Sequence, residues 1–205
     1  MQQKGTTYLT IATMSEGFYK EKGSKFLAFA HPCTNEEDAK KIIQQLRKEH
    51  FQAVHVCSAF RFGSDKKKYR SSDDGEPSNS AGPPILGQIL SFDLTNVMIA
   101  VVRYYGGTNL GVGGLINAYK TAAKEALENA TIIKQEDQFL IELQFEYPLM
   151  PAVMSIMKQA NCKIIQQQFE LSCVLKFIMP LSQATVIEKL NDLDRIKIIE
   201  HGISE

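Results

Sequence analysis

The chain has 205 residues, and its 23 lysines and arginines balance its 23 aspartates and glutamates. Hydrophobic residues make up 44% of it and charged residues 22%, which is ordinary for a globular protein and excludes an intrinsically disordered one. The longest strongly apolar run, 97–102, is far shorter than the roughly 20 residues that span a bilayer. We therefore expect no membrane partner.

The cysteines and the N-terminal segment indicate the cellular compartment. The four cysteines show no CxxC spacing, and the first twenty residues contain no continuous apolar block that would resemble a secretory signal. We expect a cytoplasmic protein with reduced thiols. The sequence has no HExxH motif and no clustered histidines, so we expect no dedicated zinc site.

Charge and glycine content divide the chain into two parts. Residues 1–134 hold 17 basic and 13 acidic residues, whereas residues 135–205 hold 6 basic and 10 acidic ones. Gly202 is the only glycine after Gly114. Such a change of composition predicts two domains, 1–134 and 135–205.

The first part contains both strands and helices. In chain order, the sequence predicts strands over 6–13 and 25–30, a helix that begins after Asn35, a strand over 53–62, a polar exposed loop over 63–79, a helix over 85–94, a strand over 96–104 and a helix over 111–130. The strand over 96–104 is apolar almost throughout, which is typical of a central strand buried on both faces. Three acidic residues follow Asn35, where negative charge stabilises a helix start. An α+β or α/β fold is expected.

The second part predicts the order β-α-β-β-α-β. Its elements are a strand over 138–147, a helix that starts within 148–151, strands over 162–169 and 171–178, a helix capped by Ser182 and a strand over 195–200. This order is that of the ferredoxin-like fold. Because that fold serves many purposes, it identifies no function by itself.

An acidic segment, 73–82, is the first candidate site. Asp73, Asp74 and Glu76 place three carboxylates within four positions, and carboxylate oxygens are the ligands that Mg²⁺ prefers. Mg²⁺ is therefore the one cofactor that the sequence suggests. The alternative is a solvated turn whose side chains cap the following helix.

A glycine-rich segment, 103–114, is the second candidate. It follows the buried strand and opens a helix, so its free N–H groups would face an anion such as phosphate. The expected anion-binding residues are Arg103, Gly106, Gly107, Gly111, Gly113 and Gly114. The segment lacks the lysine of a Walker motif, and tight packing of helix against sheet is the alternative. Arg103 would pair either with the carboxylates of the acidic segment or with a ligand phosphate.

A basic cluster lies in the expected loop over 63–79, just before the acidic residues. Lys66, Lys67, Lys68 and Arg70 surround a tyrosine, which is a pattern typical of nucleic-acid contact. Isolated runs of charge are more commonly solvated surface, and that alternative stays open.

The motifs together resemble the YigZ/IMPACT family, in its bacterial two-domain form. The segments that carry the resemblance are Asp-Asp-Gly-Glu-Pro-Ser at 73–78, Ala-Gly at 81–82, Pro-Ile-Leu at 84–86, Arg-Tyr-Tyr-Gly-Gly at 103–107, Leu-Gly-x-Gly-Gly-Leu at 110–115 with Ala118 and Tyr119, Gly-Ser-Lys-Phe at 23–26 and the strand of His55. The chain departs from the family pattern in two places. Asn79-Ser80 stands where the family has Gly-Thr, and Asn117 where it has a basic residue.

The resemblance implies a fold and a function. The first domain would share a β-α-β architecture with ribosomal-protein-like domains and with domain IV of elongation factor G, and the second would be ferredoxin-like. Eukaryotic IMPACT proteins act in translational control. We therefore expect a translation-associated regulatory or binding protein that contacts nucleic acid or ribosomal phosphates, with RNA, the ribosome or a protein as partner.

Two alternatives to this expectation remain from the residues. One is a magnesium-dependent enzyme that acts on a phosphorylated or nucleotide ligand. The other is a protein-interaction module in which both motifs are purely architectural. The motifs supply no obvious nucleophile or base, so the sequence names no catalytic residue and does not favour an enzyme.

Overall fold

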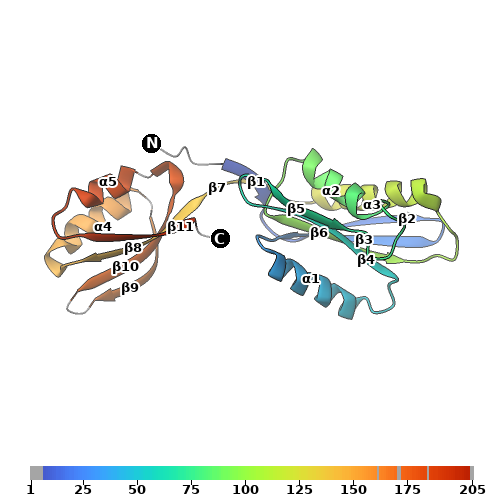
Figure 1. The fold of residues 1–205 in the computed structure, drawn as a ribbon, viewed down its shortest axis with the longest axis horizontal. Coiled ribbons are helices and arrows are strands. Elements are labelled where there is room, and N and C mark those ends of the chain that lie inside the picture. Colours follow the sequence, from blue (N-terminus) through green and yellow to red (C-terminus); the bar gives the residue numbers. More distant parts are fainter. Residues whose placement is uncertain (1–6, 161, 170–171, 184, 204–205) are drawn as a thin grey trace. The chain divides into compact units, whose positions relative to one another are not determined.

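The computed structural model describes residues 7–160, 162–169, 172–183 and 185–203 (Figure 1). The chain forms two compact units, Tyr8–Gln135 and the residues from Glu136 onward. Each unit has its own antiparallel sheet with helices against it. The mixed α+β fold class expected from the sequence is therefore confirmed.

The first unit is built on a five-stranded sheet. Its order is β2 (Ser15–Glu21), β3 (Ser24–Pro32), β6 (Val97–Tyr104), β4 (His55–Phe62) and β5 (Lys68–Ser72), with every neighbouring pair antiparallel. Every residue of β6 except Tyr104 is buried, as expected for a central strand. A separate two-stranded sheet joins β1 (Thr7–Ile11) to β7 (Ile132–Glu136).

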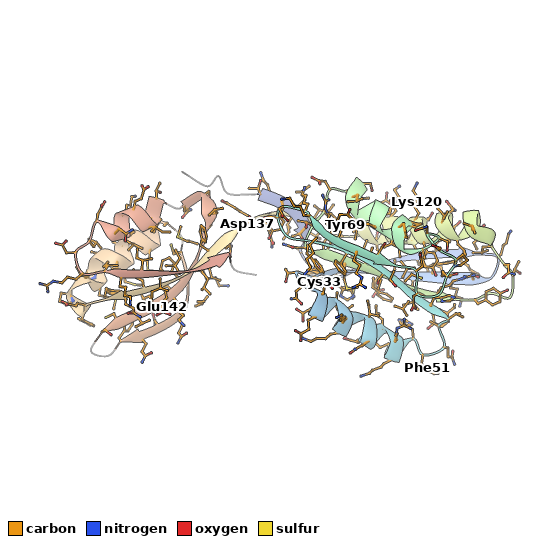
Figure 2. The ribbon with its side chains drawn as sticks, viewed as in Figure 1. Cys33, Phe51, Tyr69, Lys120, Asp137 and Glu142 are labelled. Carbon is orange, nitrogen blue, oxygen red and sulfur yellow. The ribbon has the colours of Figure 1, made fainter. Side chains whose placement is uncertain are left out.

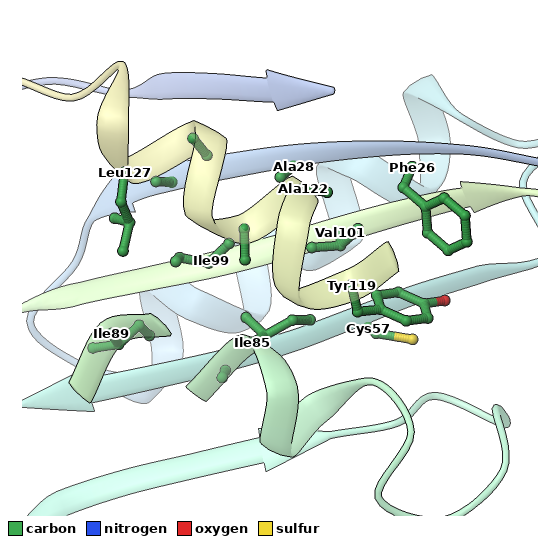
Figure 3. Packing of buried hydrophobic residues seen from close by; sticks show 14 of the residues in the cluster. Phe26, Ala28, Cys57, Ile85, Ile89, Ile99, Val101, Tyr119, Ala122 and Leu127 are labelled. Carbon is green, nitrogen blue, oxygen red and sulfur yellow. The ribbon is translucent and has the colours of Figure 1, made fainter. Parts of the chain in front are cut away.

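Helices cover both faces of this sheet. α1 (Glu36–Glu49) lies on one face, and α2 (Gly82–Ser91) and α3 (Gly111–Glu128) lie on the other (Figure 1). The Asn35 side chain accepts a hydrogen bond from the Asp38 N–H, so the expected helix cap is present. Figure 3 shows the apolar core between α2, α3 and the sheet, in which Ala122 and Leu127 of α3 face Ile99 of β6.

Three features of the first unit differ from the expectation, and one of them is β7, which the sequence did not predict. β2 was not predicted, because its alternation of small or polar residues with Phe18 gives little apolar signal. The exposed loop expected over 63–79 is wrong, because the segment contains β5 and the buried Glu76. β5 is an edge strand, and its exposed polar side chains hide its strand character.

The second unit has the element order expected from the sequence. Its sheet runs β11 (Lys197–Ile203), β8 (Gln138–Phe145), β10 (Cys173–Pro180) and β9 (Lys163–Phe169), and α4 (Met150–Gln159) and α5 (Thr185–Asn191) contribute to one core with it. Leu171, where a strand was expected to begin, lies outside the described residues. Ser182 does not adjoin α5. It lies in a 3₁₀ turn and donates hydrogen bonds to the Glu136 carboxylate.

The described part of the chain contains no helix that is long and apolar enough to cross a bilayer.

A substitution at Gly17 tests the close packing of β2 on α3. A Cβ at Gly17 would lie 2.4 Å from the Ala126 nitrogen and 2.5 Å from the Ala122 oxygen, both of them backbone atoms. Gly17→Ala is therefore expected to lower the free energy of unfolding by about 1–3 kcal/mol. Gly87→Ala is the matched control, because Gly87 lies within α2 and has no atom within 4 Å of its added Cβ.

Urea denaturation measures both variants. Gly87→Ala should be more stable than wild type by up to about 1 kcal/mol, the difference in helix propensity. A Gly17→Ala protein as stable as wild type would contradict the packing of β2.

Candidate functional site

Segments that are far apart in the sequence meet at one end of the five-stranded sheet. β4 begins and β6 ends there, since His55 pairs with Arg103. β5 runs antiparallel to β4, so residues 73–81 follow it at the same end. The turn between β2 and β3 also lies there, because Lys25 pairs with Tyr104. The acidic and the glycine-rich segments are therefore neighbours.

A buried ion pair joins the two segments. Arg103 Nη1 donates to Glu76 Oε1 at 2.6 Å, and the Tyr119 hydroxyl donates to the same oxygen at 2.6 Å. The side chains of Glu76 and Arg103 are only 2% and 7% exposed. His55 Nε2 lies 4.0 Å from Glu76 Oε2. The sequence allowed Arg103 to pair with the acidic segment or with a ligand phosphate. In the structure it pairs with a carboxylate of the acidic segment.

Two potential nucleophiles lie beside this pair but are inert. Tyr119 of α3 packs its ring against Phe26 at 5.1 Å between centroids, with Cys57 next to it (Figure 3). Burial, reinforced by the neighbouring Cys57 and Glu76, raises the pKa of Tyr119 far above its usual range. Burial likewise raises the pKa of the Cys57 thiol, which donates to the Asp73 carbonyl. Both groups are therefore protonated at neutral pH, and a protonated thiol is a poor nucleophile.

Asp73 caps the start of α2. Its carboxylate accepts hydrogen bonds from the backbone N–H groups of Asn79, Ala81 and Gly82, at 2.8 to 2.9 Å. Although burial by itself raises the pKa of Asp73, these three N–H groups outweigh it and leave the pKa below its ordinary value. This is the capping role that the sequence left open as an alternative.

Asp74 ties the acidic segment to β4 and α1. Its carboxylate accepts from the Val56 N–H at 2.6 Å and pairs with Arg47 of α1. Its carbonyl oxygen lies 2.7 Å from His55 Nδ1. Asp74 and Gly75 both have a positive φ, 47° and 87°, so the chain reverses sharply at this point. Each of the three carboxylates is thus bonded to different protein groups.

The magnesium site expected from Asp73, Asp74 and Glu76 has no convergent set of ligands. Within the described ranges, no group of three His, Cys, Asp or Glu side chains is arranged to hold a metal ion. The acidic segment therefore uses its charges to fix the end of the sheet.

The glycine-rich segment has a packed half and an open half. A Cβ at Gly106 would lie 2.0 Å from the carbonyl carbon of Gly23, and the Gly106 N–H donates to Ser24 Oγ at 3.1 Å. Tight packing therefore explains Gly106. In contrast, Gly107, Gly111 and Gly113 are exposed and have no atom within 4 Å of an added Cβ.

The open half lies at the N-terminus of α3. Leu110 precedes the helix without a capping side-chain hydrogen bond, and the first turn has no acidic residue. The first N–H groups of a helix have no partner within it and carry its positive dipole end. Gly107, Gly111 and Gly113 border this end, whereas Gly114 packs on Leu110, with 3.0 Å between an added Cβ and Leu110 Cβ.

Comparison with known proteins identifies the family. The family model described as "Impact N-terminal domain" matches residues 22–127, which include both motifs. The chain belongs to the IMPACT family. The resemblance seen in the motifs is thereby confirmed.

Individual relatives in the IMPACT family cover different shares of the chain. It is 33% identical to "IMPACT family member YigZ" of Escherichia coli, over 85% of this chain and 87% of that protein. It is 36% identical to "Protein IMPACT homolog" of Saccharomyces cerevisiae, over 54% of this chain and 43% of that one. A crystal structure of "an hypothetical protein" matches with a TM-score of 0.74 at 30% identity, and the match covers 96% of this chain and 99% of that one.

Three lysines that the sequence did not mark as site residues flank the turn that contacts the glycine-rich segment of this IMPACT protein. Lys20, Lys22 and Lys25 flank the β2–β3 turn, are exposed, and form no ion pair with any described residue. The one acidic residue between them, Glu21, accepts from the Tyr19 hydroxyl. The turn contacts Gly106 through Ser24, and this contact between distant segments, which the sequence does not show, brings the turn to the glycine-rich segment.

The predicted basic cluster lies at the other end of the sheet, around the β4–β5 hairpin. The structure does not bring it near the glycine-rich segment. Each of its cations pairs with a carboxylate, Lys66 with Asp93, Lys67 with Asp65, and both Lys68 and Arg70 with Glu36. Its contact with nucleic acid stays a prediction.

The buried ion pair of Glu76 and Arg103 predicts how substitutions at these two residues change the free energy of unfolding. Glu76→Gln would leave the Arg103 charge buried without a counter-charge, and the expected loss is about 3–5 kcal/mol of unfolding free energy. The double variant Glu76→Gln with Arg103→Met should lose less than the sum of the two single changes, because it removes both charges.

Urea denaturation of the four proteins gives this coupling directly. Glu128→Gln is the control, since it breaks the exposed Lys124–Glu128 pair and should cost less than about 0.5 kcal/mol. Strict additivity of the two buried changes would show that Glu76 and Arg103 do not interact.

The Asp73 cap predicts how the stability of the protein depends on pH. Its pKa is lowered on folding, so its stabilisation is present above the unfolded pKa and is lost as pH falls through the folded value. Asp73→Asn should therefore be less stable than wild type by about 1–2 kcal/mol at pH 7. The gap should narrow as pH falls below about 4, the ordinary pKa of Asp. Urea denaturation across this range measures the gap, and a gap that stays constant would rule out an ionised cap.

Proposed function

We propose that this protein is a translation-associated binding protein that contacts the phosphates of RNA or of the ribosome. The observations that carry the proposal are the open N-terminus of α3 and the exposed Lys20, Lys22 and Lys25, which flank the β2–β3 turn at the same end of the sheet. Free N–H groups at a helix start bind anions, and lysines add charge that attracts a polyanion.

The charge distribution supports a polyanionic ligand. Lys20 and Lys25 lie directly opposite each other across β2 and β3, and like charges in that position destabilise a sheet. No described carboxylate pairs with Lys20 or Lys25, so this repulsion is not compensated. At the same end of the unit, by contrast, Glu76 neutralises the charge of Arg103. A bound phosphate would supply the missing negative charge.

The link to translation comes from the family. Eukaryotic IMPACT proteins, which the motifs resemble, act in translational control, and the match to the yeast relative covers about half of this chain. The nature of the ligand therefore rests on the charges of the site, and the process it serves rests on family membership.

A protein-interaction module is the second candidate. It is favoured by one observation, that Asp73, Asp74, Glu76 and Arg103 are all bonded within the protein and are therefore architectural. A magnesium-dependent enzyme has no such support in the described residues.

The salt dependence of RNA binding tests the proposal. Fluorescence anisotropy with a structured RNA should show affinity that falls steeply as salt rises. The variant with Lys22→Ala and Lys25→Ala should bind more weakly, and the slope of log K against log salt should become shallower by about 1 to 2. Lys67→Ala with Arg70→Ala is the matched control at the other end of the sheet, and it should keep the wild-type slope.

The outcomes separate the candidates. A shallower slope in the control alone would move the site to the basic cluster around the β4–β5 hairpin. Absence of salt-sensitive binding in the wild type would reject nucleic-acid binding and leave the interaction module.

A further inference from the structure

The sheet face on which α1 lies is only partly covered. α1 packs on β4 and β6 and reaches β3 at its C-cap, where the His50 ring lies 5.5 Å from that of Phe29. Phe18 of β2 is 51% exposed there, although a phenylalanine on a sheet face usually lies under another element. Leu27 and Phe29 of β3, on the same face, are half-buried.

The register orders this face into rows. Lys20 lies opposite Lys25, Phe18 lies opposite Leu27, and Glu16 lies opposite Phe29. The rows are about 6.6 Å apart, because two residues of a strand advance by that length. The surface therefore changes from cationic through aromatic to acidic over about 13 Å.

We propose that this β2–β3 face binds single-stranded RNA, with a base stacked on Phe18 and its phosphate against Lys20 and Lys25. The inference rests on the proposed function and names the form of nucleic acid that the protein takes. Sites for single strands combine a basic track with aromatic rings on which bases stack. A nucleotide is itself polarised, with a phosphate at one end and hydrogen-bonding base edges at the other, and the rows match that order.

A cavity beside Phe18 is the place where the stacked base would lie. It has a volume of about 320 Å³ and is lined by Glu16, Phe18, Leu27 and Phe29, together with Glu125 of α3 and Asn129 at the C-cap of that helix. The Glu16 carboxylate only accepts hydrogen bonds, so it suits a base that presents an amino group, such as cytosine, better than uracil.

A protein partner fits this face less well. Two outward backbone groups of β2 beside the ring are already used, because the Phe18 N–H donates to Glu125 at 2.6 Å and the Glu16 carbonyl accepts from Asn129 at 2.8 Å. A peptide strand therefore cannot extend the sheet at this point. Lysines are also depleted in protein interfaces, whereas here two of them border the single exposed ring.

Binding of a short fluorescent oligocytidylate, measured by anisotropy at low salt, tests the inference. Phe18→Ala should weaken the affinity by about 5- to 100-fold, the usual loss when a stacking ring is removed. Phe18→Tyr keeps a ring and should bind like wild type. Tyr69→Ala is the matched control, since Tyr69 is a 60% exposed aromatic between Lys68 and Arg70 on β5 (Figure 2), and it should have no effect.

Oligouridylate is the second probe. The wild type should prefer oligocytidylate, and Glu16→Gln should reduce that preference. Thermal unfolding of each variant verifies that it is folded. We expect all of them to fold, because the substituted side chains are exposed.

The outcomes distinguish the stacking site at Phe18 from the more general proposal that the protein binds RNA. If the protein binds RNA in a salt-dependent way but Phe18→Ala has no effect, or Tyr69→Ala has the same effect, the stacking site is rejected and the proposed function stands. If no RNA binds at all, both are rejected. Sedimentation of the same samples would show a dimer that Phe18→Ala dissolves if a second copy covers the face, and this result would also overturn the inference.

Discussion

The buried pair of Glu76 and Arg103 is the constraint on which the functional end of the first unit depends. Removing two charges from water is expensive, so such a pair persists only where further polar contacts compensate it. The Tyr119 hydroxyl supplies one contact, and the rings of Phe26 and Tyr105 each lie 5.5 Å from the Arg103 guanidinium carbon. Because these partners come from β3, β6, α3 and the acidic segment, one interaction fixes four pieces of chain against each other.

The same constraint divides the end of the sheet into a closed half and an open half. The carboxylates of Asp73, Asp74 and Glu76 are neutralised by protein N–H and cationic groups, so they neither attract a cation nor repel a phosphate strongly. Among the described residues, the helix start of α3 has no capping side chain and the lysines of the β2–β3 turn have no ion-pair partner. The acidic motif is thus the scaffold that holds the cationic surface in place, and the two motifs need not share one ligand.

The sequence was informative where a local pattern decides the structure and silent where a distant contact does. The apolar run of β6 and the Asn35 cap are local, and both were predicted. β2 was missed because its residues give little apolar signal, and because the packing of Gly17 on the α3 backbone more than 100 residues away is a contact that no window of sequence contains. The burial of Glu76 likewise depends on Arg103, and the role proposed for Lys22 and Lys25 depends on the contact of Ser24 with Gly106.

Lys25 links the two surfaces proposed for nucleic acid. It borders the glycine-rich segment through the β2–β3 turn, and through its register with Lys20 it also forms the cationic row beside Phe18. A single strand that crosses this end of the sheet would therefore meet the helix start on one face and the aromatic ring on the other. Groups that bind one continuous ligand and share a residue are not energetically independent. In the proposal, the affinity of either surface for such a strand therefore includes a contribution from the other, so the two surfaces would form one binding unit.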